Sequence, residues 1–480
     1  MRSERRIVPY RSKVIEPISL LPRELRAARI QACGNNLFRL ASDDVYLDLI
    51  TDSGTGAMSV HQMGRMMTGD EAYAGSRSFS EMERQVRATL GYDFVIPVHQ
   101  GRAGEQVFDS VLVNHDSIVP GNAHFDTTKA HIELCGGRAV DCTIGAGRVS
   151  DAQHPFKGNL DTSALERVIS NHGSDRIAYI LVTATCNSGG GQPVSMANLR
   201  EVRRIADECG ILVVLDAARF AENAYFIKER EEGYGDKAVS DIVLEMCSYT
   251  HACIMSGKKD ALVPMGGFIG VRDEALYEKL KTPAILFEGF YTYGGMSGSD
   301  MEALAQGLRE VTNEAYLAYR IGQVRQFGTL LHRFGVPVVQ PIGGHAVFID
   351  ARKFFPNVPE DQFPAQLLCT ELYKEGGVRT VEVGSVLIGR DPDTGENIRP
   401  DLDLCRITIP RRVYTAEHLD YVADVIRTVF EEQGQLRRAG LCFDVESPGI
   451  RHFSSTFRYV HAYPDNNRKS PRYGVSEIAA

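Results

Sequence analysis

Two adjacent lysines, Lys258 and Lys259, stand in the segment SGKKDALVPMGG (256–267), after an apolar run and before a glycine-rich one. A lysine becomes a nucleophile when burial or a neighbouring cation lowers the pKa of its amine, and Lys258 is such a cation for Lys259. The small Ser256 lets the backbone come close to a bound group. A pair of lysines is also typical of a solvated surface turn, so this segment alone leaves both interpretations open.

Polar side chains follow the two apolar runs that precede this segment. Asp216 lies near the end of the run 211–219, where its carboxylate could keep a pyridine nitrogen protonated, so that pyridoxal phosphate acts as an electron sink, or could cap a helix. Arg219, one turn on, could reach the ring oxygen of that cofactor or the solvent. Asn187, after the earlier run, could bond the same oxygen or a substrate carboxylate, or belong to an ordinary turn.

A candidate phosphate site lies in VHQGRAGEQVF (98–108), where Gln100, Gly101 and Arg102 precede a helical stretch. The free N–H groups of a helix N-terminus bind phosphate, the glycine permits close approach, and the arginine adds positive charge. Phe125 could stack on a flat ring or belong to the core. Together, a phosphate cradle, an acid for a ring nitrogen and a Schiff-base lysine favour an enzyme that uses pyridoxal phosphate.

The segments that must position these residues alternate between strand-like and helix-like patterns. The apolar runs 176–184 and 211–219 flank a helical segment, 198–210, which Gly210 closes. Continuous apolar strands in such an alternation predict an α/β fold with a parallel sheet covered by helices on both faces. Ligands of such sheets bind beyond the carboxyl ends of the strands.

The pattern changes after about residue 300. A long helix or a pair of helices is predicted over 300–335, followed by short strands, and an amphipathic helix over 415–433 with Thr415 as its N-cap. Strands and helices in this order predict a second, smaller α+β domain.

Composition excludes several classes of protein. The 480 residues are 43% apolar and 24% charged, as expected for a globular protein of more than one domain. The net charge of −9 argues against nucleic acid or an anionic membrane as a partner. No apolar run approaches the roughly 18–20 residues of a bilayer span, and we expect no signal peptide. Ten cysteines without a C-x-x-C pair argue against a zinc site or disulfide scaffold, so we expect a cytoplasmic protein.

Blocks spread over nearly the whole chain resemble the β-eliminating lyases, the family of tryptophanase and tyrosine phenol-lyase. The resembling segments are TDSGTGAMS (51–59), GDEAYAGS (69–76), HQGRAGEQ (99–106), GGQPVSMAN (190–198), DAARFAENAYFIK (216–228), SGKKDALVPMGG (256–267), YGG (293–295), GGHAVFIDA (343–351), DQFPAQ (361–366) and RITIPRR (406–412). The resemblance implies the aspartate-aminotransferase-like fold of pyridoxal phosphate enzymes, a homotetramer built from tight dimers, and activation by K⁺ or a similar monovalent cation.

The resemblance also implies a division of the chain into parts. These are an N-terminal arm at 1–20, a segment joining the small domain at 21–55, a large cofactor-binding domain at 56–315, and a small C-terminal domain at 316–480.

The resemblance assigns cofactor roles to the residues singled out above. Lys259 is similar to the lysine that binds the cofactor covalently, and Asp216 to the partner of its ring nitrogen. Arg219 and Asn187 match the groups around the ring oxygen, and Phe125 matches the stacking position. The phosphate-binding positions are matched by Gln100, Gly101, Arg102, Ser256 and, next to the reactive lysine, Lys258.

Further positions are assigned by the resemblance to substrate and cation. Arg406 is similar to the bidentate clamp of the substrate carboxylate, a task that suits arginine better than lysine, and it is helped by Ser53 and Asn187. Tyr73 matches the general acid for the leaving group. The cation site is matched by Glu71 together with the carbonyls of Gly54 and Pro264.

Three positions distinguish the two members of the family. Where the phenol-lyases carry threonine, the arginine of E-R-G and a phenylalanine, this chain has Asp126, Val383 and His452. An indole needs an acceptor for its N–H and a flat apolar slot, whereas a buried arginine facing it would stay unpaired. The resemblance therefore favours elimination of indole from L-tryptophan, with Asp126 and His452 orienting or bonding the ring.

Other functions remain open at this point. The alternatives are tyrosine phenol-lyase, an aromatic aminotransferase of the same fold, and a binding protein for pyridoxal phosphate or an amino acid without catalysis. Thr250 and His251 depart from the family pattern, and the segment 411–414 is closer to the phenol-lyases.

Overall fold

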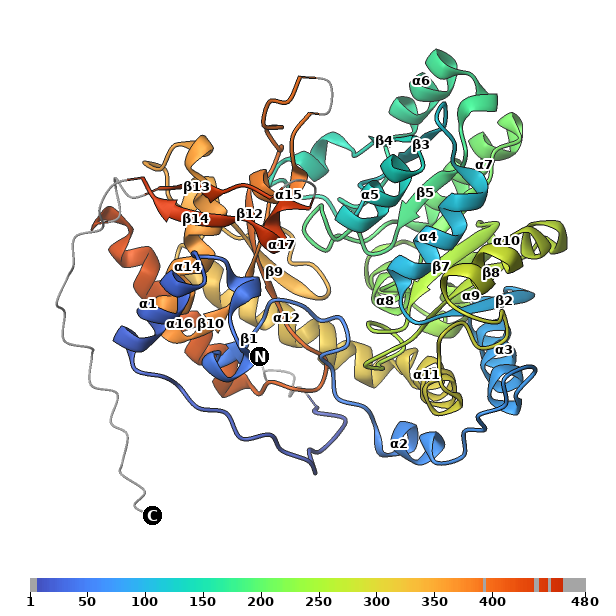
Figure 1. Cartoon of the computed structure of the whole chain (residues 1–480), viewed down its shortest axis with the longest axis horizontal. Helices are drawn as coiled ribbons and strands as arrows, with labels where there is room; N and C mark the ends of the chain where they lie inside the picture. Colours follow the sequence, from blue (N-terminus) through green and yellow to red (C-terminus); the bar gives the residue numbers. More distant parts are fainter. Residues whose placement is uncertain (1–6, 392–393, 436–439, 448–449, 461–480) are drawn as a thin grey trace.

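The computed structural model describes residues 7–391, 394–435, 440–447 and 450–460. Its larger part contains a central sheet, on the right in Figure 1. In chain order its strands are β2 (Phe94–Val98), β3 (Ile118–Gly121), β4 (Arg138–Asp141), β5 (Ile180–Thr183), β6 (Val213–Asp216), β7 (Ala252–Ser256) and β8 (Gly267–Val271). They form one seven-stranded sheet in the order β2-β8-β7-β6-β5-β3-β4.

This sheet is mixed. Strands β3 to β7 pair in parallel, but β8 runs antiparallel to both β7 and β2. The expected sheet, parallel or mixed, is therefore a mixed one, and its antiparallel strand β8 lies one position in from the edge strand β2. Only residues 257–266 separate β7 from β8, fewer than the dozen or more that a parallel crossover needs. The two lysines lie in this short connection, at the carboxyl end of β7.

Helices cover both faces of the sheet, because alternate strand residues point to opposite sides. Val213 and Leu215 pack into one hydrophobic core and Val214 into the other. One face is covered by α4 (Gly101–Leu112), α5 (Asp126–Leu134) and α10 (Glu274–Phe287). The other face is covered by α3 (Arg77–Leu90), α6 (Thr162–His172), α7 (Met196–Cys209), α8 (Phe220–Arg230), α9 (Val239–Ser248) and α11 (Gly298–Val311), with α2 (Val60–Met66) against α11.

The smaller part of the molecule has its own sheet and core. Its antiparallel sheet has the order β11 (Val381–Val383), β12 (Leu404–Thr408), β9 (Ala346–Asp350). A third hydrophobic core joins residues between 30 and 50 to residues between 324 and 457. The N-terminal α1 (Arg23–Ala32) and β1 (Leu47–Asp48) therefore lie with the C-terminal elements, as the blue and orange ribbons of Figure 1 show.

The remaining elements of this part are short, apart from three longer helices. They are α12 (Glu314–Arg333), α13 (Ala351–Phe354), α14 (Pro364–Gly376), β10 (Val378–Arg379), α15 (Ser385–Ile388), α16 (Ala416–Glu432), β13 (Leu441–Val445), α17 (Arg451–Ser454) and β14 (Thr456–Tyr459). Strand β10 pairs with β1 and β13 with β14.

The helix ends follow local sequence signals. Gly210 closes α7 in the left-handed conformation, with φ of 68°, and Thr415 precedes α16 as its N-cap. The segment 300–335 is a helix pair, because the side chain of Asn313 caps a new helix by accepting the N–H of Tyr316. Helix α12 then connects the two parts, with Tyr316 and Leu317 in the core of the large sheet and its later residues in the third core.

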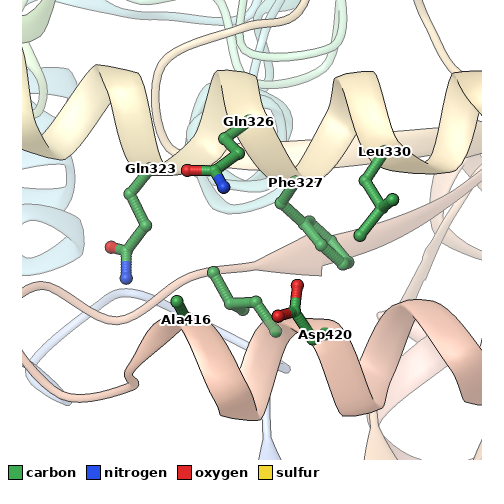
Figure 2. A pocket seen from close by; sticks show the side chains of 7 residues that line it. Gln323, Gln326, Phe327, Leu330, Ala416 and Asp420 are labelled. Carbon is green, nitrogen blue, oxygen red and sulfur yellow. The ribbon is translucent and has the colours of Figure 1, made fainter. Parts of the chain in front are cut away.

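A small hollow lies between α12 and α16, on the side of the smaller part (Figure 2). It is lined by Gln323, Gln326, Phe327, Leu330, Ala416, Leu419 and Asp420. None of these side chains belongs to the set singled out from the sequence. No helix of the described part of the chain is long and apolar enough to cross a bilayer.

Gly307 of α11 lies directly against the loop that carries Lys259. A Cβ at Gly307 would overlap the carbonyl oxygen of Ala261, whereas a Cβ at the helical Gly64 meets nothing within 4 Å. We expect Gly307→Ala to destabilise the protein by about 1–3 kcal/mol through overpacking. The matched Gly64→Ala should instead stabilise it by up to about 1 kcal/mol. Thermal unfolding of both variants tests this, and equal midpoints would show that the helix does not bear on the loop.

Candidate active site

Lys259 lies at the carboxyl end of the large sheet, and its amine donates a hydrogen bond to the Ser256 hydroxyl (Nζ to Oγ, 3.0 Å). Burial lowers the pKa of this amine to about 8; Arg219 lowers the pKa further, whereas Asp52 and Asp216 oppose the shift. At pH 7 roughly a tenth of the amine is therefore neutral, far more than for an ordinary lysine. The neutral amine is the form that can attack a carbonyl or take a proton.

Asp216 ends β6, directly beside the strands that carry the other polar groups. Its strand partners are Thr183 of β5 and Ile254 of β7, and its Oδ1 accepts the N–H of Ala218 at 3.0 Å. Burial raises the pKa of this carboxyl, while that backbone N–H, the Lys259 amine and Arg219 lower it. The position and chemistry suit a partner for a protonated ring nitrogen.

The N-terminus of α4 meets the end of β7. A side chain at Gly101 would place its Cβ 2.7 Å from the Cβ of Ser256, so a glycine is needed for this close approach. Gln100 is the N-cap of α4, and the first N–H groups of a helix have no intrahelical acceptor. Burial lowers the pKa of the Lys258 amine most, and the charge of the exposed Arg102 lowers it further. The expected phosphate residues therefore surround one helix end rich in donors and positive charge.

Arg406 of β12 reaches from the smaller part of the molecule to the large sheet. Its Nη1 donates to Asn187 Oδ1 at 3.1 Å and its Nη2 to the carbonyl of Ile50 at 3.1 Å. Its buried Nε has no hydrogen-bond partner among the residues that the structure describes, and burial lowers the pKa of the guanidinium to about 10. A buried, partly unsatisfied guanidinium is suited to a carboxylate ligand. Arg406 and Asn187, both predicted to help bind a substrate carboxylate, are in hydrogen-bond contact with each other.

Asn187 has a second neighbour that the sequence reasoning did not assign. His345 Nε2 lies 2.8 Å from Asn187 Oδ1, so that oxygen faces both His345 and Arg406, and the amide nitrogen is left as the group that can donate to a ligand. His345 stands in the segment GGHAVFIDA, which the resemblance already marked as specific.

Arg219 is buried, with 6% of its surface exposed, so the solvent-facing alternative is wrong. Its guanidinium binds Asp52 through two hydrogen bonds, Nε to Oδ2 at 3.0 Å and Nη2 to Oδ1 at 2.6 Å. Arg411 also donates to Asp52 Oδ2, at 2.7 Å. Asp52, Arg411 and the adjoining Asp260 were not predicted, although each lies within a resembling segment.

Asp126 and His452 lie side by side with buried side chains that are 6% and 3% exposed, and His452 Nε2 is 3.0 Å from Asp126 Oδ2. Asp126 is the first residue of α5 and His452 belongs to α17, so the pair joins the two parts of the molecule. Asp126 also raises the pKa of Arg406, which indicates that the pair lies near the guanidinium. Within the described part of the chain, the buried Nδ1 of His452 has no hydrogen-bond partner.

Three other predicted residues lie around this centre. Val383 is buried in β11 and shares a sheet face with Arg406, because Val381 pairs with Arg406 and residues two apart point the same way. Phe125 is half-buried and is the N-cap of α5. Ser53 is half-buried next to Asp52.

Two predicted residues have contacts elsewhere. Tyr73 is 69% exposed, and its ring packs 5.7 Å from Phe290 and 5.2 Å from Tyr293, measured between centroids. Glu71 is exposed and accepts the N–H of Gly298 at 3.0 Å. Among the described residues, no hydrogen bond or ion pair joins either of them to Lys259.

Of the expected cation ligands, Gly54 and Pro264 lie close together. The N–H of Gly54 donates to the carbonyl of Lys258 at 2.7 Å, and a Cβ at Gly54 would lie 2.8 Å from the carbonyl oxygen of Pro264. Within the part of the chain that the structure describes, no hydrogen bond or ion pair links Glu71 to these residues. That part also has no cluster of three His, Cys, Asp or Glu side chains able to hold a metal ion.

The pKa of Lys259 can be measured without any ligand. In the protein freed of small molecules, the rate at which an amine reagent labels Lys259 should rise through a midpoint near pH 8, because burial disfavours the charged form. Peptide mapping assigns the label, and an exposed lysine such as Lys13 serves as the internal control. A midpoint near the ordinary value of about 10.4 would contradict the buried position.

The fold resembles solved structures of low sequence identity. A structure of serine palmitoyltransferase from Sphingomonas wittichii superposes with a TM-score of 0.56 at 13% identity, covering 86% of this chain and 96% of that one. The expected aspartate-aminotransferase-like architecture, a large sheet domain with a smaller α+β part, is confirmed.

Curated relatives are much closer in sequence. A tyrosine phenol-lyase from Symbiobacterium thermophilum is 51% identical over 452 residues, which cover 94% of this chain and 98% of the relative. A tryptophanase from Salinibacter ruber is 48% identical over 452 residues, covering 94% and 95%. Residues 48–425 match the family described as β-eliminating lyase. This protein is therefore a member of the β-eliminating lyase family.

Proposed function

We propose that the protein is a tryptophanase, which uses pyridoxal phosphate to eliminate indole from L-tryptophan and leave pyruvate and ammonium. The observation that carries this proposal is the buried pair of Asp126 and His452 near Arg406. The pair offers polar atoms to an aromatic N–H, and position 383 is an apolar valine rather than an arginine.

The residues present fit pyridoxal phosphate. The donor-rich start of α4 and Ser256 suit its phosphate, Asp216 suits its ring nitrogen, and the lowered pKa of Lys259 suits covalent attachment. The unpartnered Nε of Arg406 leaves a donor for the carboxylate of an amino acid. When bound, pyridoxal phosphate supplies an electron sink that makes a proton beside an amino group acidic.

Different side chains of the protein would then bind the substrate and transfer its protons. Arg406 holds the substrate carboxylate, assisted by Asn187, and the neutral amine of Lys259 takes the proton from the α-carbon. Indole leaves only after a proton reaches its C3, so an acid has to lie over the ring. Asp126 and His452 orient the indole and accept its N–H.

Tyrosine phenol-lyase is the second candidate, because relatives of 51% and 50% identity carry that name. Identity summed over the whole chain is dominated by core and cofactor positions, which both activities share. The substrate depends on the few side chains that touch the leaving group. At those positions Asp126, Val383 and His452 support indole.

We also propose a cytoplasmic homotetramer that is activated by K⁺ or a similar cation. All ten cysteines are free thiols, in keeping with a reducing compartment. The exposed Tyr73 would act as general acid at the site of a neighbouring subunit. Glu71, with the carbonyls of Gly54 and Pro264, offers the oxygen ligands that an alkali cation prefers.

The choice between the two substrates can be measured directly. A phenol oxygen in this pocket meets Val383 and forfeits a charge-assisted hydrogen bond, typically worth about 1.5–3 kcal/mol. This corresponds to a handicap of roughly 10- to 150-fold. We therefore expect a higher kcat/KM for tryptophan than for tyrosine when the protein is assayed with pyridoxal phosphate and K⁺, with indole and phenol as the products quantified. Phenol as the main product would support the second candidate.

The role of Asp126 and His452 is tested by Asp126→Ala and His452→Phe. Both variants should lower kcat/KM for tryptophan more than for an S-alkyl cysteine, because the thiolate of the latter leaves without protonation of a ring. The S-alkyl substrate is the control for cofactor binding and folding. Equal losses on both substrates would show that the pair supports the fold or the cofactor rather than the indole.

A further inference from the structure

Arg411 is a buried arginine just after β12, and its side chain is 1% exposed. It binds three carboxylates from different parts of the chain: Nη1 lies 2.7 Å from Asp52 Oδ2, and Nη2 lies 2.8 Å from both Glu222 Oε1 and Asp260 Oδ1. With the neighbouring Arg219 and Arg320 these residues form a buried charge cluster.

Each carboxylate of the buried charge cluster is tied to another element of the active site. Asp52 binds Arg219 through two hydrogen bonds. Asp260 follows Lys259 directly, and its Oδ2 accepts the N–H groups of Ala221 at 2.8 Å and Glu222 at 3.3 Å, at the start of α8.

Glu222 extends the buried charge cluster to α12. Its Oε1 accepts Arg320 Nε at 3.1 Å, and Arg320 Nη1 donates to the carbonyl of Ile409 at 2.6 Å. The backbone of Arg411 is itself held, because its carbonyl accepts the N–H of Ala57 at 2.9 Å. The guanidinium is therefore fixed from both sides of the junction between the two parts of the molecule.

We propose that Arg411 is a positioning residue. It fixes Lys259 and Arg219 relative to Arg406, the proposed binder of the substrate carboxylate. Arg406 and Arg411 lie five residues apart on one segment, so a contact at Arg411 ties the clamp to the lysine loop. The proposal rests on the proposed function, in which Lys259 is the reacting amine. It assigns Arg411 no contact with substrate or cofactor.

Only arginine can make these contacts. The planar guanidinium presents separate nitrogens to Asp52 on one side and to Glu222 and Asp260 on the other, whereas the ammonium of lysine is a compact point charge on a shorter reach. The buried charge cluster contains three carboxylates and three guanidinium groups, and a buried charge requires a partner. Arg411→Lys therefore keeps the charge balance but removes the separate guanidinium nitrogens that bind carboxylates on two sides.

The matched control is Arg412→Lys. Arg412 is the next residue, its side chain is 13% exposed, and it lies 3.6 Å from Glu310 Oε2, outside the buried charge cluster. Kinetics of the holoenzyme with tryptophan should show kcat reduced on the order of 10²-fold in Arg411→Lys, the scale expected when reacting groups are misplaced. KM should change much less, and Arg412→Lys should stay within about twofold of the unchanged protein in both constants.

A second readout needs neither cofactor nor substrate. Loss of the Arg411 contacts with the three carboxylates should loosen the Lys259 loop and admit water. The pH midpoint of Lys259 labelling should then rise from near 8 toward that of an ordinary lysine. The charged groups that act on this amine are Arg219, Asp52, Asp216 and Glu105, all of which stay in the variant. Arg412→Lys should keep the original midpoint.

A folding defect is separated by a charge-balanced variant, Arg411→Met with Asp260→Asn, which leaves two carboxylates and two guanidinium groups. We expect it to unfold near the temperature of the unchanged protein and still to show the raised labelling midpoint. An unchanged midpoint in this folded variant, or equal kinetics for Arg411→Lys and Arg412→Lys, would overturn the proposal. Absence of indole from the unchanged protein would instead refute the proposed function, because the labelling comparison is independent of it.

Discussion

Charges buried between two hydrophobic cores are stable only when they are paired, and this constraint organises the centre of the molecule. Asp52, Glu222 and Asp260 have little access to water, so each needs a cation that approaches with good geometry. Arg219, Arg320 and Arg411 provide it from three separate segments. The N-terminal segment, the lysine loop, α8, α12 and the strand with Arg406 are consequently held at one point, where the two parts of the chain meet.

The same burial tunes the groups that carry the chemistry. Loss of hydration disfavours whichever form is charged, so the pKa of Lys259 falls to about 8 and that of Arg406 to about 10, while the pKa of the Asp216 carboxyl rises. Opposite charges nearby limit these shifts. A minor fraction of neutral amine therefore coexists with a charged guanidinium near neutral pH, which is the combination needed to bind a carboxylate and move a proton beside it.

Family membership and substrate choice depend on different residues. The match to the β-eliminating lyase family extends over residues 48–425, which include the large sheet and most of the smaller part. In the proposed function the leaving group is contacted from the N-terminus of α5 and from α17 and β11, while the overall identity to either kind of relative is near half. The choice of tryptophan over tyrosine in the proposed function therefore rests on three side chains rather than on overall sequence identity.

The sequence by itself determined the local elements and the identity of most polar groups at the sheet edge. Gly210 and Thr415 mark helix ends through their own backbone and side-chain chemistry, and Asp216, Asn187 and Lys259 follow apolar runs whose carboxyl ends must meet in a sheet of this kind. Such signals act over a few residues and can be read without knowing the fold. The resemblance added Arg406 as the proposed binder of the substrate carboxylate, and its Nη1 donates to Asn187 Oδ1.

Only the tertiary structure decided which distant side chains meet. Asp126 and His452 are 326 positions apart in the numbering, and Arg411 lies 359 positions from Asp52. No local pattern reports such contacts, because they depend on how two cores pack against each other. The antiparallel β8 and the exposed position of Tyr73 have the same origin: loop length and packing, rather than residue type, place each group in space.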